Sequence, residues 1–498
     1  SRSCSRSDSG SSEMAGILSV TRVLAFMLMI FSATMLLPLG AAWWYRDGAQ
    51  YVYDDGILIT FGAGALLWAI SRRHHRELQI RDGFLLVVLT WTVLPAFAAI
   101  PLYSYIKDLS WTDAYFEAVS GMTTTGATVI EGLDKLPFSI NLWRSEMVWL
   151  GGMGLIVLAV AILPLLGVGG RQIFKAEAPG PMKESKLTPR MAETAKGLWL
   201  IYGAISLACF AGFSWAGMTP GDALIHTFST MGLGGFSSHD ASFGYFDSPA
   251  IEAVTIFFML LAGLNFASHF IAFRARSLAA YGADPEAKWF LFVTIGSILM
   301  LAAYLVGAGT YEDFPTALRF AAFNTVSIAT TTGFANTDYN QWPFFAPLWM
   351  LFLCSFATCS GSTGGGIKMV RAIILYKQVF REIVRALHPA AVHPVKFGNE
   401  AVPNNILFAV LAFGFMYMVI LVSMTLVMSF TGLDIVTAFS AVVACVNNTG
   451  PGLNEVGPAT TYKSLTDVQI WLCTFAMLLG RLEIFTLLVV LTPAFWRK

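Results

Sequence analysis

Four short motifs, each built around a glycine, are the part of the chain whose residue types and spacing fit the chemistry of a bound cation. The motifs are SGMTTTGAT (120–128), STMGLGGFS (229–237), IATTTGFAN (328–336) and CVNNTGPGL (445–453). Aligned on one glycine, they recur at intervals of 109, 98 and 117 residues, at Gly126, Gly235, Gly333 and Gly450. Glycine reaches backbone angles that turn neighbouring carbonyls toward one axis, where four sets of carbonyl oxygens can replace a cation's hydration shell. The motifs therefore predict a backbone-built cation site.

A stretch with the sequence of a half-helix precedes each motif. These stretches are WTDAYFEAVSGM from Trp111, TPGDALIHTFSTM from Thr219, FPTALRFAAFNTVSIA from Phe314 and TGLDIVTAFSAVVACV from Thr431. Asp, Thr and Pro at their starts suit an N-cap or a first helical turn, and each stretch is too short to cross a bilayer. A re-entrant helix of this kind leaves its last carbonyls unpaired, with the negative end of its dipole in the protein interior. We expect four such ends to converge on one cation path.

The elements that must position these motifs are membrane-spanning helices. The chain has 498 residues, of which 56% are hydrophobic and only 12% charged, and its mean hydropathy is +0.64. These values are too apolar for a soluble protein of this size. Ten windows are long and apolar enough to span a bilayer, at 22–42, 56–71, 83–103, 147–168, 196–216, 250–273, 288–308, 344–380, 403–429 and 467–493. The eighth contains CSGSTGGGIK (359–368) and is predicted to be broken.

The basic residues give these spans an orientation. If the N-terminus is placed inside the cell, 24 of the 31 Lys and Arg residues fall on the inner side and six on the outer side. Arg481 is left within the last span. Lys and Arg collect on the cytoplasmic side of membrane proteins, so both termini are predicted to be cytoplasmic. The outer segments are acidic, which would concentrate cations at a pore mouth or simply keep the loops soluble.

The pattern predicts an all-α integral membrane protein with four tandem span–pore helix–span repeats around a central pore, after two N-terminal transmembrane helices. The expected boundaries are 14–82 for the N-terminal pair and 83–170, 171–280, 281–395 and 396–498 for the repeats. Residues 1–13, rich in Ser and Arg, precede Met14 and are expected to be a non-native or disordered leader.

No pattern in the sequence indicates an enzyme. The six cysteines form no CxxC pair, and neither a Walker motif, a GxGxxG loop nor a nucleophile elbow occurs. His226 and His239 have no neighbours at a repeating metal-ligand spacing, and the net charge of zero gives no surface for nucleic acid. We therefore predict no catalytic residues, no cofactor in this chain, and no metal beyond an ion at the four glycine motifs.

With its four motifs, its paired spans, its Gly-rich break and the stretch MLLGRLEIFTLL, the chain from about residue 20 to 498 resembles the Trk/Ktr/HKT superfamily of potassium transporters, and within it the membrane subunits of bacterial Trk uptake systems. The resemblance implies that the motifs form a potassium filter, and that glycine rather than serine in the first motif goes with preference for potassium. The fourth motif departs from the family's TTG pattern, with Asn447 and Asn448 before its threonine. The filter residues are Thr124, Thr125, Gly126, Ala127, Leu233, Gly234, Gly235, Phe236, Thr331, Thr332, Gly333, Phe334, Asn448, Thr449, Gly450 and Pro451.

The resemblance also places an intramembrane gate at the Gly-rich break, formed by Ser360, Gly361, Ser362, Thr363, Gly364, Gly365 and Gly366. Arg481 lies near the middle of the last window, and a charge at that depth is costly and functional by default. It either faces the cavity below the filter or forms a salt bridge between helices. Glu483, two residues away, points to another helix face and is a poor partner for it.

Further implications of the resemblance concern partners and location. The family is found in the cell inner membrane, works as a homodimer, and is controlled by a soluble, TrkA-like nucleotide-binding ring on the cytoplasmic face. The basic segments 169–196 and 368–396 would receive such a ring, although anionic membrane lipids attract the same residues.

A secondary active transporter, which couples a solute or potassium to a sodium or proton gradient, is the alternative to a gated pore. Inverted halves with two broken helices would favour this carrier, whereas four units of the same direction with filter glycines favour a pore.

Overall fold

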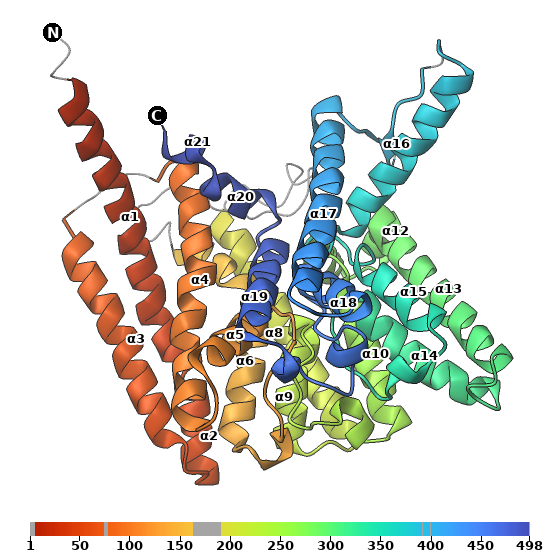
Figure 1. Cartoon of the computed structure of the whole chain (residues 1–498), viewed down its shortest axis with the longest axis horizontal. Helices are drawn as coiled ribbons and strands as arrows, with labels where there is room; N and C mark the ends of the chain where they lie inside the picture. The colour runs from red at the N-terminus through yellow and green to blue at the C-terminus, as the bar shows by residue number, and fades with distance from the viewer. Residues whose placement is uncertain (1–4, 74–77, 163–190, 391, 399, 498) are drawn as a thin grey trace.

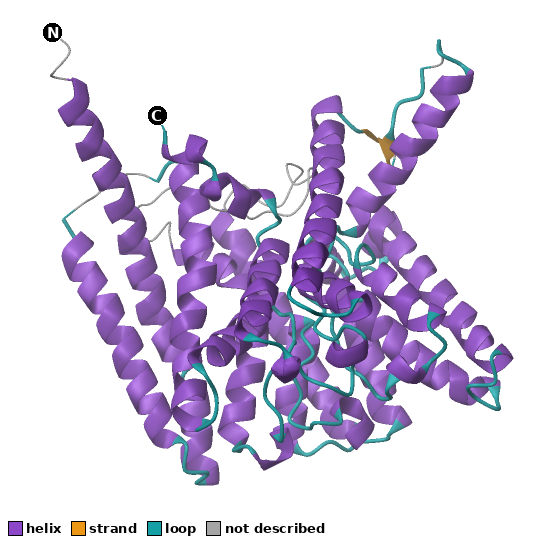
Figure 2. Ribbon diagram, in the orientation of Figure 1, coloured by secondary structure: helices purple, strands orange, loops and turns teal. Residues whose placement is uncertain are grey.

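The computed structural model describes residues 5–73, 78–162, 191–390, 392–398 and 400–497, and this part of the chain is almost entirely helical (Figure 1, Figure 2). Two short strands, β1 (Lys396–Phe397) and β2 (Glu400–Ala401), form an antiparallel hairpin. Among the described residues, six helices are long and apolar enough to cross a membrane, or up to eight if each of two bent pairs is one span. The predicted all-α membrane fold is confirmed.

The N-terminal helices stand at one side of the molecule. They are α1 (Ser5–Thr34), α2 (Leu36–Tyr45) and α3 (Gln50–Ser71). α1 packs along α3, and α2 continues α1 toward the end of the molecule opposite the two termini (Figure 1). α1 includes residues 5–13, the segment that was expected to be a leader.

The rest of the chain runs four times through a long helix, a short helix and a second, interrupted helix. The long helices are α4 (Ile80–Tyr105), α8 (Met191–Trp215), α13 (Pro285–Gly307) and α17 (Asn404–Phe430). The short helices are α5 (Trp111–Met122), α9 (Pro220–Gly232), α14 (Phe314–Ala329) and α18 (Ile435–Val446). The segments that follow are α6 (Phe138–Ile162); α10 (Pro249–Gly263), α11 (Phe266–Ala275) and α12 (Ala279–Ala283); α15 (Phe345–Cys354) and α16 (Met369–Leu387); and α19 (Asp467–Arg481), α20 (Phe485–Leu491) and α21 (Pro493–Trp496). This order agrees with the predicted span–pore helix–span repeat. The residue boundaries given for the four repeats remain a prediction.

Short 3₁₀ turns lie in the connections that leave the four motifs. They are η1 (Leu133–Lys135), η2 (Ser242–Tyr245), η3 (Tyr339–Gln341), and η4 (Asn454–Val456) with η5 (Tyr462–Ser464).

A side-chain cap fixes the start of each short helix. Ser110 accepts a hydrogen bond from the Asp113 N–H at 3.1 Å, and Thr219 and Asp313 cap α9 and α14 in the same way. Capping satisfies backbone donors that a helix start would otherwise leave unpaired. The fourth helix begins four residues later than the predicted Thr431, because Gly432 has a left-handed φ of 102° and the next cap is Asp434.

The second helix of each set is interrupted. The predicted break of the eighth window is confirmed, since residues 355–368 between α15 and α16 are not helical. The sixth and tenth windows were predicted as single spans, and each is bent in the structure: α10 and α11 meet at 97° and α19 and α20 at 114°. Asn265 caps a new helix at the first bend, and Glu483 and Ile484 have left-handed φ at the second. In α6, Gly154 has a non-helical φ of 82°.

Apolar side chains cover the outer faces of the long helices. Leu58 on α3, Phe292 on α13 and Phe415 on α17 are at least 70% exposed. The short helices, by contrast, are mostly buried, including polar residues such as Glu117 and Asn324. An apolar exterior around a polar interior suits a bilayer as solvent, so the short helices and their motifs occupy the protected centre.

Candidate functional site

The four glycine motifs form a closed ring of backbone. The first motif contacts the second, the second the third, the third the fourth, and the fourth returns to the first. A Cβ atom placed on each glycine would lie within 2.9 Å of the next motif's backbone: Gly126 against the Gly235 N at 2.2 Å, Gly235 against the Gly333 C at 2.8 Å, Gly333 against the Thr449 O at 2.1 Å, and Gly450 against the Thr125 O at 2.6 Å. Real side chains do not fit at such distances, so the ring requires glycine at these four positions.

The backbone of each motif turns in the same way. Two residues before the glycine, φ is positive in all four motifs, at Thr124, Leu233, Thr331 and Asn448. Such a conformation is uncommon for residues other than glycine. It is locally strained, and its recurrence in all four motifs means that the surrounding contacts must stabilise it. The glycine itself also has positive φ in the first, third and fourth motifs.

The side chains of the motifs do not fill the ring. Phe236 packs under the guanidinium of Arg144, and the Phe334 ring packs on Phe243 at a centroid distance of 4.6 Å. The hydroxyls of Thr330 and Thr332 hydrogen-bond to each other at 2.7 Å, as those of Thr123 and Thr125 do at 2.8 Å in the first motif. The structure thus brings all four predicted filter segments together, with their backbones in contact.

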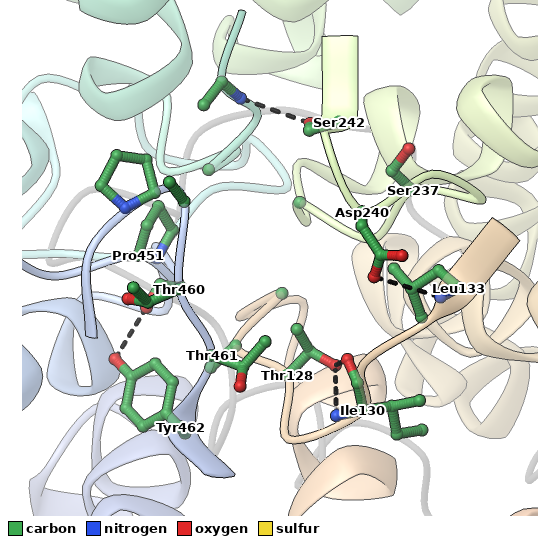
Figure 3. A pocket seen from close by; sticks show the side chains of 18 of the residues that line it. Thr128, Ile130, Leu133, Ser237, Asp240, Ser242, Pro451, Thr460, Thr461 and Tyr462 are labelled. Carbon is green, nitrogen blue, oxygen red and sulfur yellow. Dashed lines mark hydrogen bonds between the residues drawn. The ribbon is translucent and has the colours of Figure 1, made fainter. Parts of the chain in front are cut away.

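A pocket of about 610 Å³ opens onto the ring from the side of the loops that leave the motifs (Figure 3). Three carboxylates, Glu131, Asp240 and Glu455, are among its lining residues. Asp240 accepts hydrogen bonds from the N–H groups of Gly132 and Leu133 at 2.9 and 3.1 Å, and so ties the first loop to the second. Arg144 and His239 also line the pocket, so its lining carries both acidic and basic groups.

His239 lies beside this pocket between two carboxylates. Its Nδ1 is 2.5 Å from Asp134 and its Nε2 is 3.3 Å from Asp222. Burial alone would lower the pKa of His239, but the hydrogen bonds and charges of the two carboxylates outweigh burial and raise this pKa above its usual value. The pKa of Asp134 is lowered, because hydrogen bonds from His239 and from the Asp240 N–H outweigh the effect of its burial. The ring's outer loops are therefore joined by the contacts of His239 and Asp240 with Asp134.

The Gly-rich loop crosses the other side of the ring, at the carboxyl ends of the short helices. Thr363 donates to the Met231 carbonyl of α9 at 3.0 Å, and the Gly365 N–H donates to Thr331 Oγ1 of the third motif at 2.9 Å. A Cβ on Gly365 would lie 2.0 Å from the Asn447 oxygen at the fourth motif. The loop therefore contacts the second, third and fourth motifs on this side of the ring.

Arg481 ends α19 next to both the ring and the loop. Its guanidinium donates to Thr363 O at 3.1 Å, to Thr124 Oγ1 at 3.4 Å, and to the carbonyls of Gly151 and Gly152 on α6. Glu483 forms an ion pair with Arg371 at 2.7 Å, which agrees with the expectation that it is a poor partner for Arg481. Arg481 therefore lies between the first motif, the loop and α6.

Some residues of this region were missed by sequence reasoning. Asn265 lies at the bend between α10 and α11, where the Phe266 N–H donates to the Gly361 carbonyl of the loop. The signal was present, since Asn is a strong N-cap residue and stood inside an apolar window. Lys368, which donates to the Gly364 carbonyl at 2.5 Å, had been counted only as an inner-side charge. The predicted basic segment at 169–196 lies mostly outside the described residues.

Comparison with known proteins agrees with this architecture. The family model described as "TrkH: Cation transport protein" matches residues 50–498. The "Trk system potassium uptake protein TrkH" of Vibrio parahaemolyticus is 47% identical over 483 residues, covering 96% of this chain and 99% of that protein. The protein of the same name from Escherichia coli K12 is 45% identical over 480 residues, with the same two coverages.

A solved structure is similar over nearly the whole chain. The crystal structure of the potassium transporter TrkH from Vibrio parahaemolyticus superimposes with a TM-score of 0.87 at 45% identity, covering 97% of this chain and 100% of that one. A family model over most of the chain and relatives at this identity are decisive: the chain belongs to the TrkH family of cation transport proteins.

Proposed function

We propose that this chain takes up potassium through a gated pore in the cell inner membrane, with the four glycine motifs as the filter. The observation that carries the proposal is the closed ring, in which four glycine backbones contact one another in sequence. A ring of backbone turns presents carbonyl oxygens at short and fixed distances, which is how a filter replaces the water around potassium. The names of the relatives, which are potassium uptake proteins, support the choice of ion.

The Gly-rich loop and Arg481 form the gate in this proposal. The loop hydrogen-bonds to the ends of α9 and α14, and the guanidinium of Arg481 binds both the loop and the first motif. A fixed positive charge next to a cation path opposes conduction, and a glycine-rich loop can move with few steric limits.

A cytoplasmic partner would move this gate. We propose a TrkA-like nucleotide-binding ring, which meets the end of the molecule where both chain termini lie (Figure 1). α16 starts at the gate loop and projects toward that end, and it carries Arg381 and Arg385 there. A ring that pulls on α16 would pull directly on the loop. Both termini are then cytoplasmic, and two copies of the chain form the working unit.

Reconstitution of the purified protein into liposomes tests the proposal. Separate potassium, sodium and proton gradients are imposed, and the reversal potential is measured for each. A potential that follows the potassium gradient alone supports a pore. A potential that also shifts with the sodium or proton gradient would instead indicate coupled transport. The bends at Asn265 and Ile484 are the observation that favours this alternative, because carriers bind ions at broken helices.

Replacing Gly126 by Ser is expected to lower the discrimination of potassium over sodium. Gly126 has a φ of 78°, and a side chain there meets the Gly235 backbone, so the carbonyls of both motifs must shift. The uptake ratio of rubidium to sodium in liposomes measures the change. Gly307 on α13 has no atom within 4 Å of an added Cβ and serves as the control, since Gly307→Ser should leave the ratio unaltered. An unchanged ratio in Gly126→Ser would refute the filter.

Shortening the loop between Gly361 and Gly366 is expected to raise ion flux in the absence of the partner, because a loop that cannot reach the third motif cannot close the path. Rubidium flux into liposomes is measured next to the melting temperature. Equal or lower flux from a folded and inserted variant would count against the loop as a gate.

Replacing Arg481 by Gln is expected to raise potassium flux severalfold while the melting temperature changes little. A unit charge about 4 Å from a passing cation opposes it by roughly 4 kcal/mol at an effective dielectric constant near 20. The matched control is Arg371→Gln, which leaves the partly buried carboxylate of Glu483 without its ion pair and should lower stability without a gain in flux. If Arg481→Gln behaved like Arg371→Gln, Arg481 would be a strut between helices and not a barrier.

A further inference from the structure

A buried ion pair lies directly behind the first two motifs. Glu117 is on α5 and Arg144 on α6, and their side chains are 0% and 1% exposed. Arg144 Nη2 is 2.8 Å from Glu117 Oε1, and Arg144 Nε donates to the same oxygen at 2.9 Å. Charges at this depth are stable only when their remaining hydrogen-bonding positions are also filled.

The first motif fills the positions left on Glu117. The Val129 N–H donates to Glu117 Oε2 at 3.0 Å, and the Thr128 hydroxyl donates to Oε1 at 2.9 Å. Thr128 ends the first motif, two residues after Gly126. The carboxylate therefore fixes the position of the extended segment that carries the carbonyls of Gly126 and Ala127.

Arg144 holds the second motif at the same time. Its Nη1 donates to the Ser237 carbonyl at 3.2 Å, and its guanidinium lies over the Phe236 ring at 4.3 Å from the ring centre. Phe236 and Ser237 directly follow Gly235. Because one planar guanidinium binds a carboxylate and a second backbone together, it fixes the spacing of two neighbouring motifs.

The same position is used differently in the other motifs. Nine residues before the glycine stand Glu117, His226, Asn324 and Ala441. His226 bonds to the Ser237 hydroxyl at 2.9 Å, and Asn324 donates to Asn336 at 2.6 Å, so each bonds to the motif of its own repeat. Only at the junction of the first and second motifs, among these described contacts, does a charged pair join two motifs. At this junction a Cβ on Gly126 would lie 2.2 Å from the Gly235 N.

We propose that Glu117 and Arg144 are positioning residues that set the ion selectivity of the pore by holding the first two motifs at a fixed separation. The proposal rests on the proposed function, since it assumes that the ring is the filter. Neither side chain needs to touch the ion. The pair acts through the backbone, whose carbonyls must keep one spacing to prefer potassium over the smaller sodium ion.

The test is the rubidium-to-sodium uptake ratio of variants in liposomes, with the melting temperature measured on the same preparations. The double variant Glu117→Gln with Arg144→Gln removes both charges, so that no buried charge is left alone. We expect its ratio to fall on the order of tenfold, which corresponds to about 1.4 kcal/mol of lost discrimination. Glu117→Asp keeps both charges but withdraws the carboxylate from the Val129 N–H, and a smaller fall is expected.

Arg319 and Glu252 provide a matched control. They form an ion pair at 2.8 Å between α14 and α10, and Arg319 also pairs with Asp247. In the described contacts, this pair bonds to no residue of the four motifs. Neutralising it as Arg319→Gln with Glu252→Gln should lower the melting temperature and leave the uptake ratio unchanged.

The outcomes separate the two levels of the proposal. If Gly126→Ser changes the ratio and the Glu117 and Arg144 variants do not, the positioning role is refuted and the filter stands. If none of the three changes it, the filter itself is refuted. A pair that serves folding alone predicts a lower melting temperature with an unchanged ratio in every variant that folds, Glu117→Asp included, and this result would overturn the proposal.

Discussion

The backbones of the four glycine motifs meet so closely that no side chain fits between them. A Cβ on Gly333 would lie 2.1 Å from the fourth motif, and one on Gly450 would lie 2.6 Å from the first. Four segments that are far apart in sequence can meet in this way only if each arrives from outside and turns back before the axis. This constraint explains why the helices before the motifs are short and begin at fixed caps. It also explains the residue with left-handed φ that turns each motif away from its helix.

Close approach continues below the ring, where the second helices cross the ends of the short ones. A Cβ on Gly151 would lie 1.9 Å from the Met122 carbonyl, and one on Gly480 would lie 1.9 Å from the Val446 carbonyl. These carbonyls are the last ones of α5 and α18, which have no partner within their own helices. Small residues let the second helices pack against the ends of the short helices. The interruptions at Gly154, Asn265 and Ile484 lie within a few residues of these contacts. The breaks therefore lie where the second helices pack against the carboxyl ends of the short helices.

Sequence patterns predicted the local features of this arrangement and missed those that depend on distant segments. The starts of α5 at Trp111 and α14 at Phe314 could be predicted because capping and apolar periodicity are local properties. The bends after Gly263 and Arg481 could not, since hydropathy over a window does not change when a helix turns within it. The acceptors of Arg481 were also beyond reach, because backbone carbonyls of α6 have no residue-type signature. A buried charge in an apolar window indicated that a partner existed without indicating which one.

One side chain joins the three parts on which the proposed gating depends. Arg481 donates to the first motif at Thr124, to the loop at Thr363 and to the interrupted helix α6 at Gly152. When the loop withdraws from the axis, the guanidinium loses the Thr363 carbonyl and must either follow the loop or rely on α6. If the guanidinium follows the loop, its charge moves away from the position under the ring together with the loop. The proposed barrier and the loop are thus linked by the hydrogen bond from Arg481 to the Thr363 carbonyl, so in this proposal a partner that moves the loop also acts on the Arg481 charge.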